Sequence, residues 1–159
     1  MQFTIATVAV ALAAFVGTVA GESHTVHFDN RCGYGTPTLI QGGNVLSTGG
    51  DYTSNGPLTA AIAYLQTGSC GFNGEGCTLI ETTLVNPTSP GSGSSTDISL
   101  IPPHSFSVTS GFGYYDGCDG AGADCTYSGC PTAFHSSGDT GVQVACQSNN
   151  VNLAITFCD

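Results

Sequence analysis

Residues 114–134, YYDGCDGAGADCTYSGCPTAF, contain three of the eight cysteines of the chain, Cys118, Cys125 and Cys130. This stretch is rich in glycine and polar residues, so it offers too little apolar surface to fold by burial. We therefore predict that disulfides hold it in place. Cys146 and Cys158 return to the same region at the end of the chain, and the predicted frame is two faces of β-structure brought to this stretch.

Short runs of β-branched and aromatic residues lie on either side of it, separated by Gly and Pro turns. HTVHFDN at residues 24–30 alternates with the period of a strand. LTAAIAYLQ at residues 58–66 is predicted as a strand, because it lies between NGP and GSCG and is too short for a free helix. Residues 86–96, NPTSPGSGSST, have no apolar side chain to bury and are predicted as an exposed loop. Further strands are predicted at residues 38–41, 44–48, 78–85, 97–101, 105–108, 142–145 and 151–157.

No segment keeps a helical period over three turns. The predicted fold class is therefore an all-β sandwich or flattened barrel. Arg31 is the only basic residue against eleven acids, which gives a formal net charge of −10. Nucleic acid and anionic membranes are poor partners for such a chain, because both require cationic neutralisation. The charge indicates either solubility in an extracellular space or a negative cleft that binds neutral polyols or a cation.

The N-terminal segment resembles a secretory signal. Residues 3–20 are a run of small and apolar residues, followed by a small and polar stretch at 21–23. We expect residues 1–23 to be removed, with cleavage after Ala20, Gly21 or Ser23, and residues 24–159 to form one domain in the extracellular space or cell wall. Eight cysteines in a secreted chain of this size indicate four disulfides. We expect a monomer that has no cofactor and, once the signal is removed, no membrane association.

Several motifs, in order along the chain, resemble the thaumatin-like proteins, a secreted β-sandwich family of sweet-tasting, pathogenesis-related and antifungal proteins. FDNRCGYGTPTL is similar to the first strand of that family, and TGSCGFNGEGC to its TGDCGG motif. TLIETTLVNP and STDISLIPPHSFSV resemble its TLAEF and YDISLVDGFNVPM strands. CPTAF resembles CPDAYSY, and VQVACQSNNVNLAITFC resembles the closing strands with their VTFC end. The resemblance covers nearly all of residues 24–159 and implies a thaumatin-like β-sandwich stapled by four disulfides.

The resemblance also implies how the cysteines pair. The implied pairs are Cys32 with Cys158, Cys70 with Cys77, Cys118 with Cys146, and Cys125 with Cys130. Full-length members carry a long disulfide-rich insertion between the last two of these positions, where this chain has only TYSG. This departure implies a small, fungal-type short form without the second domain.

In this family an acidic cleft with one arginine and four acids lies between the sandwich and the second domain, and some members bind or hydrolyse β-1,3-glucan there. Matched motif by motif, Glu81 falls on the acid of TLAEF, Asp97 on the acid of YDIS, and Asp139 near the acid that follows CPDAYSY. The cleft arginine has no counterpart, because Arg31 lies in another segment. The fourth acid falls around residues 94–95 and is lost.

Hydrolysis of a glycosidic bond requires two carboxyl groups, one of which has a raised pKa. Glu81 and Asp97 are the candidate catalytic pair, with Glu81 as the proton donor if the cleft is apolar enough to keep it neutral. Without a second domain the cleft loses one wall, and solvent would keep both acids ionised. Whether the protein is an enzyme therefore stays open, and any activity would be that of a weak β-1,3-glucan hydrolase.

Aromatic rings stack on the apolar faces of sugars, so tyrosines near the acids are candidate ligand-binding residues. Tyr114 and Tyr115 are assigned this role together with Asp139, and Tyr64 and Tyr127 are further candidates. The alternative is that most of these rings pack against disulfides or one another. The core is assigned Phe28, Phe106, Phe134 and Phe157.

The predicted function is binding of a neutral cell-wall polysaccharide such as β-1,3-glucan, in cell-wall remodelling or antifungal defence. One alternative is a secreted structural or effector protein that binds a protein partner. Another is a copper site: if cleavage followed Ser23, His24 would become the N-terminal residue and could chelate copper with His27, His104 or His135. Apart from this copper alternative, we assign no metal site.

Overall fold

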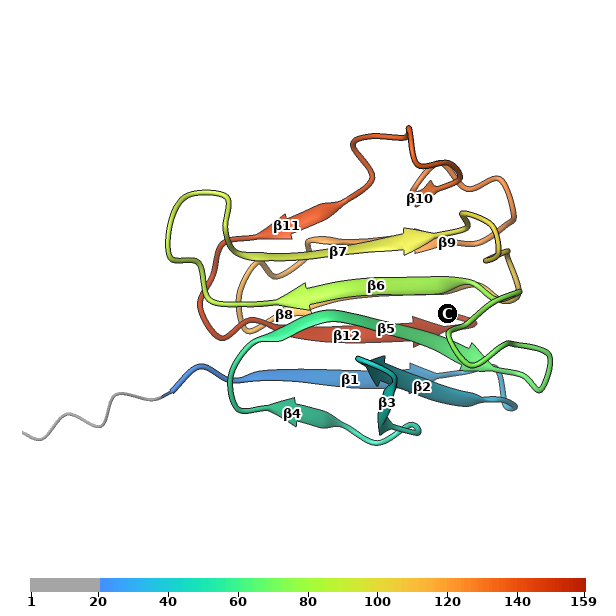
Figure 1. Cartoon of the computed structure of the whole chain (residues 1–159), viewed down its shortest axis with the longest axis horizontal. Helices are drawn as coiled ribbons and strands as arrows, with labels where there is room; N and C mark the ends of the chain where they lie inside the picture. Colours follow the sequence, from blue (N-terminus) through green and yellow to red (C-terminus); the bar gives the residue numbers. More distant parts are fainter. Residues whose placement is uncertain (1–20) are drawn as a thin grey trace, which may run out of the picture.

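The computed structural model describes residues 21–159, and it builds them from strands that form two sheets (Figure 1). The apolar run at residues 3–20 lies outside the described residues. The five-stranded sheet has the order β4(Tyr52–Ser54), β1(His24–Asn30), β12(Asn152–Phe157), β8(Ser110–Tyr115), β9(Gly122–Cys125). The seven-stranded sheet has the order β10(Ala133–Phe134), β7(Ser94–Ser99), β6(Leu79–Leu84), β5(Leu58–Gln66), β2(Thr36–Gln41), β3(Asn44–Ser47), and β11(Val144–Cys146) also pairs with β7.

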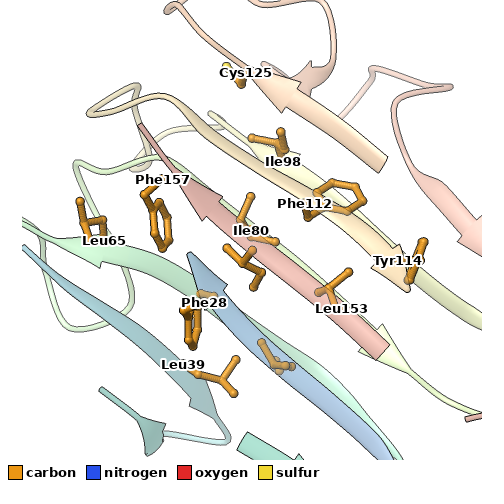
Figure 2. Packing of buried hydrophobic residues seen from close by; sticks show 14 of the residues in the cluster. Phe28, Leu39, Leu65, Ile80, Ile98, Phe112, Tyr114, Cys125, Leu153 and Phe157 are labelled. Carbon is orange, nitrogen blue, oxygen red and sulfur yellow. The ribbon is translucent and has the colours of Figure 1, made fainter. Parts of the chain in front are cut away.

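The two sheets enclose one main hydrophobic core. Alternate residues of each strand point inward, as in β12, where Leu153, Ile155 and Phe157 are fully buried. Figure 2 shows Leu153 and Phe157 of β12 in the same cluster as Leu39 and Ile80 of the opposite sheet. The predicted all-β sandwich is confirmed. In residues 21–159 no helix has the length and apolar character needed to cross a membrane.

The two ends of the domain are joined side by side. β1 pairs in parallel with β12, so that Val26 lies opposite Leu153 and Phe28 opposite Ile155. Just beyond the paired strands, Cys32 is bonded to Cys158. Arg31 lies at the same place, with Nη2 2.8 Å from a carboxylate oxygen of Asp29 and a second ion pair to Asp159. The last strand is therefore fixed to the first by backbone, disulfide and charge.

Four disulfides connect the strands. They are Cys32–Cys158, Cys70–Cys77, Cys118–Cys146 and Cys125–Cys130, the same pairs that the thaumatin-like resemblance implies. Two of them hold the glycine-rich stretch at residues 114–134. Our view that this stretch has too little to bury is wrong in part, because Tyr114 is buried at the end of β8 and β9 pairs with β8 as a hairpin.

The loop predicted at residues 86–96 is also wrong at its end. Ser94 and Thr96 belong to β7 and are fully buried. Their hydroxyl groups are satisfied inside the sandwich: Ser94 Oγ exchanges hydrogen bonds with the backbone of Val85, and Thr96 Oγ1 lies 2.6 Å from Thr82 Oγ1. Polar residues can therefore form an interior strand where each hydroxyl finds a partner.

Glu22 and Ser23, which precede the first strand, also contact the rest of the domain. The Glu22 carboxylate accepts a hydrogen bond of 2.6 Å from the backbone N–H of Asn86 and lies 3.1 Å from Nε2 of His24. The backbone N–H of Ser23 donates to Asn150 Oδ1. Glu22 and Ser23, which the sequence assigns to the removed segment, thus contact the loops at this end of the sandwich.

The disulfides differ in how much they restrict the unfolded chain. The Cys32–Cys158 bond closes a separation of 126 residues and the Cys70–Cys77 bond one of 7. Because the entropy of loop closure grows with loop length, we expect replacing Cys32 and Cys158 by Ser to lower the free energy of unfolding by about 5 kcal/mol, and replacing Cys70 and Cys77 by about 2.5 kcal/mol. Urea denaturation of both double variants measures the difference. Equal losses would contradict the loop-length argument.

Candidate functional site

A pocket of about 360 Å³ lies on the outer face of the seven-stranded sheet. Its floor is formed by β5, β6 and β7, and its wall by β10 and the segment that leads into β11. Such a volume lies within the usual range for small-molecule sites. The lining residues are Ala60, Ala61, Ile62, Glu81, Thr82, Thr83, Ser95, Asp97, Ile101, Phe134, Ser137 and Gln143.

The strand register places the two candidate acids side by side in this pocket. Ile62 pairs with Glu81, and Glu81 pairs with Asp97. Because Ile80 and Thr82 on either side of Glu81 are buried against the core, Glu81 points outward. Directly opposed residues of antiparallel strands have Cβ atoms about 4.5–5.5 Å apart. The carboxyl groups of Glu81 and Asp97 are therefore neighbours, as the motif comparison leads one to expect.

Asp97 is the unusual member of the pair. It is only 7% exposed, and within residues 21–159 its Oδ1 has no hydrogen-bond partner. Oδ2 accepts a long hydrogen bond of 3.4 Å from Nε2 of Gln143. Burial, helped by the neighbouring charge of Glu81, raises the pKa of Asp97 to about 6, although the Gln143 contact opposes the shift. This acid therefore takes up a proton in mildly acidic solution, which is a property required of a proton donor.

A β-bulge shapes the other end of the pocket. The pairing of β5 with β6 shifts between Leu58 and Ala61, and Ala60 adopts a φ of 50°. The backbone N–H of Ala60 donates to Oγ1 of Thr83 instead of a strand partner. A left-handed conformation is strained for a residue with a Cβ atom, and such strain persists where surrounding contacts enforce it. The small side chain at the bulge leaves the floor of the pocket open.

Asp139 is not in the pocket. Its carboxylate accepts hydrogen bonds from the backbone N–H groups of His135 and Ser136 and from the Ser136 hydroxyl. These bonds, the His135 one first, lower the pKa of Asp139. The carboxylate is thus used to shape the turn that carries Ser137, one of the lining residues. We assign Asp139 a structural role in the pocket wall rather than direct ligand contact.

The four candidate tyrosines are not brought together. Tyr114 is 3% exposed inside the sandwich, so its ring has no face available to a sugar, and its assignment as a ligand-binding residue is wrong. Tyr115, its neighbour on β8, points out of the five-stranded sheet, on the opposite side of the molecule from the pocket. Tyr64 is buried, and Tyr127 is exposed in the Cys125–Cys130 loop.

The aromatic side chain that does line the pocket is Phe134, which the sequence analysis places in the core. It is half-buried, because β10 pairs with β7 at the edge of the sheet and sets Phe134 beside Ser99. Phe106 is also only partly buried. Gln143 and Ser95 were missed as well. Their positions depend on the pairing of β7 with β11, which the residue pattern does not reveal.

The histidines are engaged within the protein. His24 is fully buried, with Nδ1 2.7 Å from the carbonyl oxygen of Val151 and Nε2 against Glu22. His27 contacts Asp51, while His104 and His135 each contact a backbone carbonyl. No group of three or more potential metal-ligating side chains occurs in the described part of the chain. No contact among the described residues favours the copper alternative centred on His24, whose ring is fully buried with Nδ1 against the Val151 carbonyl.

Comparison with known proteins supports the fold. No protein-family profile matches the chain, and no curated protein sequence matches it. Among solved structures it is similar to the thaumatin-like xylanase inhibitor TLXI, with a TM-score of 0.54 and 18% sequence identity over 86% of this chain and 99% of that one. The chain thus has the thaumatin-like fold, stapled by four disulfides.

The raised pKa of Asp97 has a consequence for stability. Since the folded state binds the Asp97 proton more tightly than the unfolded state, wild-type stability should fall as the pH rises from about 4 to about 6. We expect Asp97→Asn to be more stable than the wild type by about 1–2 kcal/mol at pH 7, and equal to it near pH 3.5. Urea denaturation at several pH values measures this difference. The same gain in Asp119→Asn, an exposed control, would show instead that general charge repulsion is responsible.

Proposed function

We propose that this chain is a secreted, monomeric thaumatin-like protein that binds a neutral polysaccharide such as β-1,3-glucan in the pocket between β5, β6, β7 and the segment before β11. The observation that carries the proposal is the buried Oδ1 of Asp97, which accepts no hydrogen bond from the rest of the described chain, at a pocket that Ser95 also lines. Buried polar atoms normally have partners, and sugar hydroxyl groups could donate the missing bonds.

The rest of the pocket suits a sugar more than a charged ligand. Phe134 offers an apolar ring surface, and Gln143 and Thr83 offer further hydrogen-bonding groups. Anionic ligands are disfavoured, because the pocket contains two acids and the single arginine of the chain is paired with Asp29 and Asp159 at another site. A role in cell-wall remodelling or antifungal defence, for a short form without the second domain, is consistent with these features.

Binding is tested by retention on insoluble β-1,3-glucan. We expect Asp97→Asn to weaken retention about ten-fold at pH 7, because a hydrogen bond to a carboxylate contributes more than one to a neutral amide. Asp119→Asn serves as the matched control, because it removes the same charge from an exposed position outside the pocket. Tyr115→Ala reports on the opposite sheet. If Tyr115→Ala weakens retention and Asp97→Asn does not, the polysaccharide binds the other face and the proposed site is wrong.

Hydrolysis is the alternative reading of the same pocket, favoured by the raised pKa of Asp97 beside Glu81. In that case Asp97 would donate the proton and Glu81 would act as the second carboxylate. Measuring reducing ends in the same incubation separates turnover from binding. Release of reducing sugar that Glu81→Gln abolishes would establish a glucanase, and retention without reducing ends would establish a binding protein.

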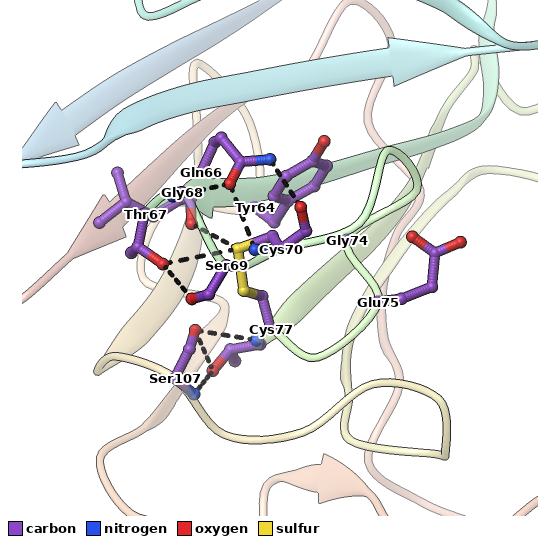
Figure 3. The surroundings of a disulfide bond; sticks show 12 residues. Tyr64, Gln66, Thr67, Gly68, Ser69, Cys70, Gly74, Glu75, Cys77 and Ser107 are labelled. Atoms are coloured by element: carbon purple, nitrogen blue, oxygen red, sulfur yellow. Dashed lines mark hydrogen bonds between the residues drawn. A yellow bond between two sulfur atoms is a disulfide. The ribbon is translucent and has the colours of Figure 1, made fainter.

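A second candidate function is inhibition of a carbohydrate-degrading enzyme. It is favoured by Phe72, which is 54% exposed on the loop closed by the Cys70–Cys77 disulfide. Internal hydrogen bonds hold this loop: Tyr64 donates a 2.7 Å hydrogen bond to the Phe72 carbonyl. The Gln66 side chain bonds the backbone of Cys70, next to the Cys70–Cys77 disulfide (Figure 3). A prearranged loop loses little entropy on binding, and exposed aromatic residues are frequent anchors of protein interfaces. The structurally similar protein TLXI is a thaumatin-like xylanase inhibitor.

Assays against a panel of purified endo-xylanases test this candidate. We expect inhibition of at least one of them, weakened at least ten-fold by Phe72→Ala, because a central aromatic anchor contributes about 2 kcal/mol or more. Val45→Ala is the matched control, since Val45 is similarly exposed on the edge strand β3. No inhibition by the wild type, or equal inhibition by Phe72→Ala, would remove the candidate.

A further inference from the structure

A buried phenol connects the five-stranded sheet to the wall of the pocket. Tyr114 comes from β8, and its ring packs edge-on against Phe112 with centroids 6.2 Å apart (Figure 2). Its hydroxyl crosses to the other sheet, where it lies 2.9 Å from the carbonyl oxygen of Val144 and 3.0 Å from Oγ1 of Thr96. The ring is buried, the contact to Thr96 is buried as well, and the contact to Val144 is partly buried.

The chemistry of these groups gives the contacts a direction. A carbonyl oxygen can only accept, so the single phenol proton of Tyr114 is donated to Val144. The phenol oxygen is then free to accept from Thr96, whose hydroxyl lies 2.6 Å from that of Thr82. The result is a buried chain of hydroxyl groups that runs from β6 through β7 and Tyr114 to the backbone of β11. Such chains are strengthened by the low dielectric constant of the interior.

β11 needs this support because it is short and lies at an edge. It comprises three residues, Val144–Cys146, and pairs with β7. The Cys118–Cys146 disulfide holds its last residue, and the Tyr114 hydroxyl bonds its first. Gln143, directly before that first residue, is the side chain that contacts Asp97. The segment from His135 to Gln143 is otherwise mostly exposed.

We propose that Tyr114 is a positioning residue for the pocket: its hydroxyl fixes the start of β11, which in turn keeps Gln143 against Asp97. Tyr114 does not touch a ligand itself. Its effect on ligand binding rests on the proposed function, whereas its effect on the surroundings of Asp97 does not. The sequence analysis singled out this tyrosine for stacking on a sugar, and the geometry assigns it an indirect role.

Tyr64 supplies a matched control. It is also buried, and its hydroxyl also donates to a backbone carbonyl, that of Phe72, but in the Cys70–Cys77 loop away from Asp97. Tyr114→Phe and Tyr64→Phe thus each remove a hydroxyl group that donates to a backbone carbonyl. A purely structural role predicts comparable losses of stability and no other difference between the two variants.

The experiment compares the two variants by carboxyl-detected NMR titration and by retention on insoluble β-1,3-glucan. In Tyr114→Phe we expect the titration midpoint of Asp97 to move from about 6 toward its ordinary value, because water gains access and burial is the largest cause of the shift. Loss of the Gln143 hydrogen bond acts in the opposite direction and is the smaller effect. We expect retention to fall about five-fold, a typical size for coupling between residues in one network. Tyr64→Phe should change neither.

The Asp97 titration tests the role of Tyr114, and the glucan retention of the wild type tests the proposed function. If the wild type does not bind glucan, the proposed ligand is wrong, but the Asp97 titration still tests the role of Tyr114. If Tyr114→Phe does not fold, Gln143→Ala removes a later contact in the series that leads from Tyr114 to Asp97. This variant should itself shift the titration midpoint of Asp97. An Asp97 titration that is unchanged in Tyr114→Phe, or in Gln143→Ala where the former is unfolded, would overturn the inference.

Discussion

The bond between Cys32 and Cys158, together with the parallel pairing of β1 and β12, is the constraint on which this structure depends. It joins the first and last strands of the domain, so that the chain between Cys32 and Cys158 forms one covalently closed loop. A glycine-rich chain has many accessible conformations when it is unfolded. A disulfide that closes so long a loop removes many of these conformations. The remaining three disulfides act locally, at the Cys70–Cys77 loop and around the glycine-rich stretch.

The register of β5, β6 and β7 places the residues that form the floor of the pocket. The outer face of a sheet in a sandwich is usually polar and solvated, but here the segment before β11 folds over part of it. Asp97 is buried beside Glu81 in this pocket, and burial is the largest cause of its raised pKa. The chemistry of the site is therefore sensitive to anything that moves β11.

The sequence predicts the strands better than it predicts the residues that line the pocket. Residues 24–30, which alternate, and residues 58–66, which lie between two turns, are strands at the predicted bounds. The strand predicted at residues 97–101 begins earlier, at Ser94, because the hydroxyl groups of Ser94 and Thr96 are buried with partners on β6 and in the segment that follows it. Glu81 and Asp97 were found through motif resemblance, whereas Phe134 and Gln143 depend on edge pairings that no local pattern encodes. Tyr114 was recognised as important for the wrong reason, since composition does not reveal which way a side chain points.

The ion pairs of Arg31 affect how the protein meets proteases. Trypsin-like enzymes cut after lysine or arginine, and this chain has a single residue of either type. That residue is held by Asp29 and Asp159 directly beside the disulfide that closes the domain. A digestive or defence protease of this specificity therefore finds only one bond to cut, at a position where the side chain it must bind is already occupied. The near absence of cationic residues thus limits cleavage by proteases of this one specificity.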